Sequence, residues 1–248
     1  ARTVADAAVL LEVLAGADPA DPATAASAGR VPRDYRQFLV QDGARGARIG
    51  VARAKLRGLS PHADAAVEAA IADLRRLGAV IVDPADIPHL GSYDEAELEV
   101  LLHEFKDGLE SYLASWAPGA PVRTVRDLVA FNLAHRDEEM PWFGQDLLER
   151  AAAKGPLTDP AYRDALSRVR RLSRREGLDA VFRRHRLDAL LVPTGGPAWL
   201  TDPVNGDHVT VSSSTPPGVS SCAPRRTNTR NPGATRRPTS AKTRRCSR

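Results

Sequence analysis

Apolar residues in the N-terminal third of the chain follow the patterns of two helices and two strands. Residues 3–16 repeat apolar positions at helical spacing, and Thr3 can cap the start of this helix. Residues 48–52 form a short apolar run that is typical of a strand. Residues 60–78 predict a second helix, and residues 79–82 a second strand that follows it at once. Strand, helix and strand with short connections indicate a βαβ unit.

The pattern over the next ninety or so residues is mostly helical. Prolines and one Gly-Pro pair separate four predicted helices, at residues 93–115, 123–136, 144–153 and 159–185. Residues 187–192 predict a third strand, which runs into the turn Pro193-Thr194-Gly195-Gly196-Pro197. Strands at both ends of a long helical region predict an α/β fold.

The apolar pattern stops at about Pro216. Residues 217–248 contain one valine and no Leu, Ile, Phe, Tyr or Trp. They cannot bury enough apolar surface to offset the entropy that ordering would cost, so we predict a disordered tail. Enrichment in Arg, Pro, Thr and Ser is also what a shifted reading frame of GC-rich coding DNA gives. The hypothesis of a frameshift fails if no alternative frame encodes an apolar continuation.

Charge and cysteines divide the chain at the same place. The tail carries eight Arg, one Lys and no acidic residue, a charge of +9, so residues 1–216 carry −5 of the net +4. Both cysteines, Cys222 and Cys246, lie in the tail, which fits a reducing compartment. No apolar run approaches the roughly 20 residues that cross a bilayer, and a signal-peptide pattern is missing. We therefore expect a cytoplasmic protein with no membrane partner.

The turn after the third predicted strand is the best candidate for ligand binding. This turn contains Thr194, Gly195 and Gly196. Its two glycines would let backbone amides approach an anion or a carbonyl closely. A plain turn is the alternative interpretation of the same residues. The hydroxyls of Ser212, Ser213 and Ser214 would need a base and an orienting partner, and the sequence places neither beside them. These serines are interpreted as a loop.

Other residue patterns do not indicate a metal, a cofactor or a nucleic-acid partner. His103 begins a stretch that resembles a zinc-binding helix, but the second His four residues later is missing. The body has no cysteine for a structural zinc site, and no phosphate-binding glycine loop occurs. The basic tail offers phosphate affinity without aromatic residues for base stacking. We expect no cofactor and no metal, and nucleic-acid binding is not favoured.

Several short segments resemble, in the same order and at similar spacing, the C-terminal half of amidase-signature enzymes. These segments are residues 1–21, 46–52, 77–83, 104–113, 138–145, 154–157 and 187–207. The last segment, with its Pro193-Thr194-Gly195-Gly196-Pro197 turn, is the closest match. Residues 1–216 are therefore identified as the C-terminal portion of an amidase-signature domain, and residues 217–248 as a basic tail outside it.

The resemblance implies a partial amidase-signature fold, with a mixed β-sheet flanked by helices. It also implies hydrolysis of a carboxylic amide by a serine nucleophile, with a second serine relaying protons to a lysine base. In the family these residues lie N-terminal to the region that this chain resembles. The resemblance therefore assigns no catalytic residue here, and Thr194, Gly195 and Gly196 are the residues expected to line the substrate mouth.

Three functions remain open. The first is a catalytically incomplete part of a hydrolase, inactive alone, whose parent acts on a small or peptide-like amide. A start at Ala1 with Met140 as the only methionine favours a piece of a longer sequence. The second is a remnant of a glutamyl-tRNA amidotransferase A-type subunit, but the long helical region favours a stand-alone amidase. The third is a binding module that uses the basic tail, which deletion of residues 217–248 would test.

Overall fold

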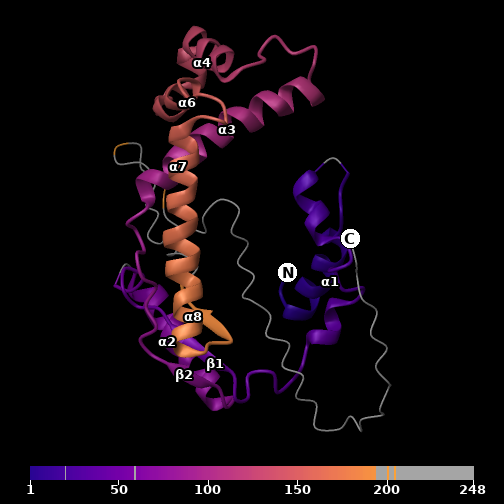
Figure 1. The fold of residues 1–248 in the computed structure, drawn as a ribbon, viewed down its shortest axis with the longest axis vertical. Coiled ribbons are helices and arrows are strands. Elements are labelled where there is room, and N and C mark those ends of the chain that lie inside the picture. Colours follow the sequence, from indigo (N-terminus) through magenta and orange to yellow (C-terminus); the bar gives the residue numbers. More distant parts are fainter. Residues whose placement is uncertain (20, 59, 194–199, 201–203, 205–248) are drawn as a thin grey trace, which may run out of the picture.

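The computed structural model of the chain describes residues 1–19, 21–58, 60–193, 200 and 204. It is rich in helices and has one small sheet, which confirms the predicted α/β class. In Figure 1 the sheet lies at one end of a long stack of helices, and α1 lies to one side of that stack. The predicted tail and the turn that starts at Thr194 lie outside the described residues.

The sheet has three parallel strands in the order β2-β1-β3. Its strands are β1 (Arg48–Val51), β2 (Val80–Val82) and β3 (Ala189–Leu191). The central strand β1 is the most buried of the three, as its apolar sequence predicts. All described strands run parallel, so the antiparallel strand that a mixed sheet requires does not occur within this part of the chain.

The predicted βαβ unit joins β1 to β2 through α2 (Pro61–Arg76). Ser60 caps this helix by accepting a hydrogen bond from the backbone N–H of Ala63, and Pro61 occupies its first turn. Gly78 follows the helix with a φ of +86°, a left-handed conformation that glycine adopts without strain. Local sequence signals therefore fix both ends of α2.

Close packing at Gly50 joins β1 to the residue before β3 and to the segment after β2. A Cβ atom at Gly50 would lie 2.5 Å from Cδ1 of Leu187 and 2.9 Å from Cβ of Ala85. Ala85 and Leu187 are buried together with Val181, and Phe182 packs against them. The missing side chain of Gly50 thus leaves room for Ala85 and Leu187, on which Val181 of the last helix packs.

The N-terminal segment has little contact with this core. The helix α1 (Val4–Leu14) begins at Thr3, whose hydroxyl accepts a hydrogen bond from the N–H of Asp6, as predicted. It packs against η2 (Tyr35–Phe38), and η1 (Pro22–Ser27) lies between them in sequence. None of the residues of α1 is buried.

The helical region between β2 and β3 forms a stack that extends away from the sheet (Figure 1). Its first part comprises α3 (Asp94–Trp116), α4 (Val125–Ala134), α5 (Arg136–Glu139) and α6 (Asp146–Ala152). A core of Leu102, Val125, Ala151 and Ala152 joins α3, α4 and α6. The predicted helices of this region are confirmed, except that α5 adds a short turn after α4.

The predicted helix at 159–185 is continuous but contains a change of register. It consists of α7 (Pro160–Val169), a π-helical segment η3 (Arg170–Leu178) and α8 (Asp179–His185). Figure 1 shows it as the long axis of the helical stack, which reaches from α6 to the sheet. Asp159 caps its start by accepting a hydrogen bond from the N–H of Ala161. The helix therefore carries the chain from the distal helices back to β3.

Candidate functional site

The carboxyl edge of the parallel sheet is the first candidate site, because ligands of such sheets bind where the strands end. The chain leaves β1 at Ala52-Arg53, β2 at Asp83-Pro84 and β3 at Val192-Pro193. Pro193 is buried and lines a small hollow with Arg53, Leu56 and Glu68. The predicted turn therefore begins beside the charged residues of this edge.

Arg53 connects β1 to β2 and α2 through two carboxylates. Its Nε and Nη2 donate to the two carboxylate oxygens of Asp83, at 2.6 and 2.5 Å, in a bidentate pair. Its Nη1 donates to Glu68 at 2.5 Å. These hydrogen bonds lower the pKa of the Asp83 and Glu68 carboxyl groups and raise the pKa of the Arg53 guanidinium. The guanidinium is thereby held by protein carboxylates.

The loop after β1 is also held by hydrogen bonds between side chains and the backbone. A carboxylate oxygen of Asp86 accepts from the backbone N–H groups of Arg53 and Ala54, at 2.6 and 2.8 Å. Lys55 donates from Nζ to the carbonyl oxygen of Leu90 at 2.6 Å. The loop is therefore tied to the segment that follows β2, and the side chains of Arg53 and Lys55 are paired within the protein.

The three predicted substrate-lining residues are not placed. Thr194, Gly195 and Gly196 lie outside the described residues, and so do Ser212, Ser213 and Ser214. Their proposed contact with substrate stays a prediction. The structure contributes the anchor of the turn, because buried Pro193 starts it at the carboxyl end of β3.

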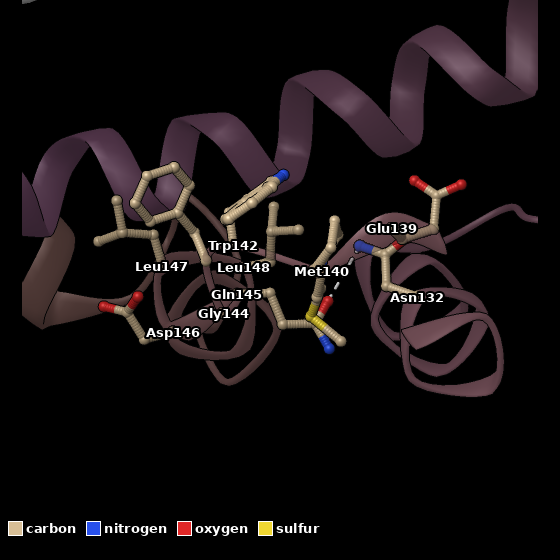
Figure 2. Close-up of a pocket in the computed structure, with 11 residues that line it drawn as sticks. Asn132, Glu139, Met140, Trp142, Gly144, Gln145, Asp146, Leu147 and Leu148 are labelled. Atoms are coloured by element: carbon tan, nitrogen blue, oxygen red, sulfur yellow. Dashed lines mark hydrogen bonds between the residues drawn. The ribbon is translucent and has the colours of Figure 1, made fainter. Parts of the chain in front are cut away.

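A second candidate site is an open groove beside α4 and α6, at the opposite end of the helical stack from the sheet (Figures 1 and 2). Its volume is about 490 Å³. Its apolar wall consists of Met140, Pro141, Trp142, Phe143, Leu147 and Leu148. Trp142 is 71% exposed and Phe143 53% exposed, so both rings are available to a ligand. Concave apolar surfaces with a few polar groups are the usual form of ligand sites.

The floor of the groove is formed by the amide side chains of Gln145 and Asn132. The buried Gln145 side chain accepts from Nδ2 of Asn132 at 3.0 Å and donates to the carbonyl oxygen of Val129 at 3.2 Å. Figure 2 shows this pair in the middle of the groove, with Glu139 near Asn132 and Asp146 near Leu147. The groove thus has a tethered polar floor, apolar walls and carboxylates toward both ends.

Only an indirect signal for this groove is present in the sequence. Residues 138–145 stand out as a segment of family resemblance, but the acidic residues before Met140 have the pattern of an ordinary solvated patch. The groove depends on Gln145 bonding back across 13 residues to Asn132. Such a contact leaves no periodic pattern.

His103 has a packing role in the structure. It is buried in α3, and its Nδ1 lies 2.9 Å from the carbonyl oxygen of Glu99. Its ring also contacts the ring of Tyr162, at 5.6 Å between centroids. In the described part of the chain, no cluster of His, Cys, Asp or Glu side chains is arranged to hold a metal ion.

The lysines in the described ranges are paired away from serine hydroxyls. Lys154 donates to both carboxylate oxygens of Glu99, at 2.8 and 2.6 Å, and Lys106 donates to the carbonyl oxygen of Lys154 at 2.6 Å. Lys55 is bonded to the carbonyl oxygen of Leu90. Within these residues, no lysine amine is hydrogen-bonded to a serine, which a serine–lysine relay requires.

A family model described as Amidase matches residues 1–220. The chain belongs to the amidase family. A probable amidase of Arabidopsis thaliana is 32% identical to this amidase chain over 197 residues, which is 77% of the chain and 36% of the relative. This agrees with the resemblance found in the residues and extends over the predicted body of the chain.

Solved structures give the same assignment. A peptide amidase in complex with the competitive inhibitor chymostatin superposes with a TM-score of 0.76 at 46% identity, over 84% of this amidase chain and 42% of the other. The native peptide amidase of Stenotrophomonas maltophilia gives a TM-score of 0.73 at 48% identity, over 80% and 40%. The fold is therefore shared with peptide amidases.

The A-type subunits of glutamyl-tRNA(Gln) amidotransferases are also similar to this amidase chain. The one from Anaeromyxobacter sp. (strain K) is 46% identical over 98 residues, which is 38% of the chain and 19% of the relative. The chain spans less than half the length of the relatives that it matches. Among the described helices, none has the length and apolar character to span a membrane.

Proposed function

We propose that this amidase chain forms part of the substrate-binding wall of a hydrolase that acts on small or peptide-like amides. The observation that carries the proposal is the match to peptide amidases at 46–48% identity over at least 80% of the chain. The turn at Thr194, Gly195 and Gly196, anchored by Pro193, would add backbone amides at the carboxyl edge of the sheet.

The second part of the proposal is that these 248 residues do not hydrolyse amides by themselves. A serine nucleophile needs a base within hydrogen-bond reach, and each described lysine amine is bonded to a carboxylate or a carbonyl oxygen instead. The resemblance places the two serines and the lysine of the family outside the segments that this chain matches. No residue here inherits a catalytic role.

The test is an assay of the purified chain for release of ammonia from a dipeptide amide. We expect no release above that of buffer, before or after treatment with a serine-directed acylating reagent. The intact Stenotrophomonas maltophilia peptide amidase serves as the positive control. Release of ammonia that the reagent abolishes would overturn the proposal.

A role as part of a glutamyl-tRNA amidotransferase A-type subunit is the second candidate, because these relatives are up to 46% identical to part of the chain. Those matches cover 36–38% of the chain, and two other A-type subunits match 78% of it at 32–35% identity, below the 46–48% identity of the peptide amidases over at least 80% of the chain. Association of the purified chain with the other amidotransferase subunits in gel filtration would support this candidate. Failure to co-elute would remove it.

A further inference from the structure

The helix α1 is apolar around its whole circumference and yet lies at the surface. Only Asp6 and Glu12 are polar or charged among its 11 residues. A helix that is apolar on all sides is normally enclosed in a protein core. In this structure none of its residues is buried, and its large apolar side chains are 45–77% exposed: Val4, Val9, Leu10, Leu11, Val13 and Leu14. Water therefore contacts a surface whose sequence is suited to an interior.

Little of this surface is covered by the rest of the described chain. The main neighbour of α1 is η2, a helix of only four residues. The last residue of η2 and the two that follow it, Phe38, Leu39 and Val40, are apolar and exposed themselves. Figure 1 shows α1 apart from the helical stack and from the sheet. The two segments thus form one apolar surface, and exposed apolar patches of this kind mark interaction sites.

The family match indicates which polypeptide covers this surface. The model described as Amidase matches from residue 1 onward, so α1 belongs to the family domain. The peptide amidase structures match 80–84% of this chain, but the matched part is only 40–42% of their own length. More than half of such a domain therefore lies outside the match, and that part is large enough to enclose a helix.

A second copy of this chain fits the surface less well. Two copies in a symmetric dimer would pair the same apolar surface with itself. Two helices that lie side by side cover only one side of each other, and an apolar helix would keep its remaining sides in water. A larger polypeptide can surround α1, so the unmatched part of an amidase domain is the better occupant.

We propose that the surface formed by α1 and residues 38–40 binds the unmatched part of an amidase domain as a separate polypeptide. The chain is then one component of a two-part amidase, in which apolar contacts join the parts without a peptide bond between them. The inference rests on the proposed function, because a substrate-binding wall without catalytic residues requires the remainder of the domain.

Co-expression tests the contact. The part of the Stenotrophomonas maltophilia peptide amidase that this chain does not match is produced with an affinity tag, together with the untagged full chain. We expect an equimolar complex to be purified through the tag. We also expect more of the tagged part in the soluble fraction than when it is produced without the chain. Failure of the unmodified chain to co-purify would overturn the proposal.

Charged side chains on α1 should weaken the complex. Val13→Lys/Leu14→Glu changes side chains that are 77% and 74% exposed, so the fold of the free chain should be unaffected. We expect its affinity for the tagged part to fall by roughly a hundredfold, because two large apolar side chains are no longer buried on binding. Displacement of fluorescently labelled, unmodified chain from the purified complex measures the affinity of each variant.

The matched control is Tyr112→Lys/Leu133→Glu, which makes the same change of charge at exposed apolar positions on α3 and α4. It should displace the labelled chain as well as the unmodified chain does. Equal losses of affinity in the two variants, or no loss in the α1 variant, would overturn the proposal. Circular dichroism of each variant checks that a loss of affinity is not a loss of helix.

Two further measurements identify the occupant. The intact Stenotrophomonas maltophilia peptide amidase should not bind the chain, because its own matching segment already occupies the site. Sedimentation velocity should show no self-association of the chain within the complex. Binding to the intact enzyme as strong as to the tagged part would indicate nonspecific apolar adhesion, and persistent self-association would indicate a second copy. Either result would contradict the proposal.

These results are separable from the proposed function. Binding is measured without turnover, so failure to form the complex leaves the absence of ammonia release by the free chain unaffected. Conversely, ammonia release by the free chain would overturn the catalytic part of the proposed function while leaving the binding measurements valid.

Discussion

At the scale of single residues, Gly50 shows how tightly the central strand packs against the residues beside it. A methyl group at this position would lie within 3.0 Å of Leu187, Ala85 and Leu190. Contacts that short are repulsive, and the surrounding core offers little free volume to absorb them. The absence of a side chain is therefore a structural requirement at this position.

Replacement of Gly50 by Ala should lower the free energy of unfolding by about 1–3 kcal/mol, the usual cost of overpacking a core. The matched control is Gly108→Ala in the interior of α3, where a Cβ would meet nothing within 4 Å. That variant should gain up to about 1 kcal/mol because alanine favours the helix. Urea unfolding followed by circular dichroism measures both changes, and a stable Gly50 variant would contradict the packing argument.

The carboxyl group of Asp83 predicts how the stability of the fold depends on pH. Its hydrogen bonds to Arg53 hold its pKa in the folded protein below the ordinary value of 3.8. The stabilisation is therefore fully present above pH 3.8 and is lost as the pH falls through the lower pKa of the folded state. Asp83→Asn should cost about 1.5–3 kcal/mol at pH 7, the range for hydrogen bonds to charged groups.

The difference between Asp83→Asn and the unchanged chain should shrink as the pH falls below 3.8. Urea unfolding at a series of pH values from 7 downward measures it. Asp42→Asn is the control. Asp42 lies 3.6 Å from Arg45, and both side chains are more than 70% exposed, so this ion pair contributes little to stability. A difference that stays constant through the acid range would show that the ion pair does not carry the effect.

At the scale of elements, the caps were predictable and the π-helical segment was not. Thr3 and Ser60 cap helices through hydrogen bonds to N–H groups three residues later, so the whole signal lies within one turn of sequence. The π-helical segment Arg170–Leu178 has a wider turn, in which a Cβ at Gly177 would lie 2.6 Å from the carbonyl oxygen of Leu172. Helical spacing over residues 159–185 fits either register, so periodicity alone did not reveal the change.

For the sheet as well, the sequence predicted the strands but not how they pair. Apolar runs predicted all three strands and the helix between the first two. In the sheet, β1 lies in the centre. Gly50 pairs with Val82 of β2 on one side and with Leu190 of β3 on the other. The pairing of β1 with β3 depends on the helices that return the chain to the sheet. No local pattern in the sequence encodes this pairing.

At the scale of the whole molecule, apolar surface gathers on α1. The exposed apolar residues of this helix are Val4, Val9, Leu10, Leu11, Val13 and Leu14. The strands β2 and β3 also form the edges of the described sheet. Exposed apolar patches and unpaired strand edges both promote association of chains.

We expect the purified chain to self-associate, and Val13→Lys/Leu14→Glu to reduce this association because it interrupts the apolar surface of α1. Tyr112→Lys/Leu133→Glu is the control, since it makes the same change of charge at exposed apolar positions outside α1. Sedimentation velocity at several concentrations measures both variants. A monomeric chain with a sharp, reversible, cooperative melt would contradict the prediction.

The sequence by itself determined the α/β class, most element boundaries and, through short segments of resemblance, the family. The class and the boundaries arise from periodicity and capping residues, which act over a few residues and can be read directly along the chain. Only the tertiary structure decided that Arg53 pairs with Asp83 across 30 residues, and that Gln145 and Asn132 form the floor of an open groove. Those contacts depend on how whole helices and strands pack, because packing brings together side chains that the sequence keeps apart.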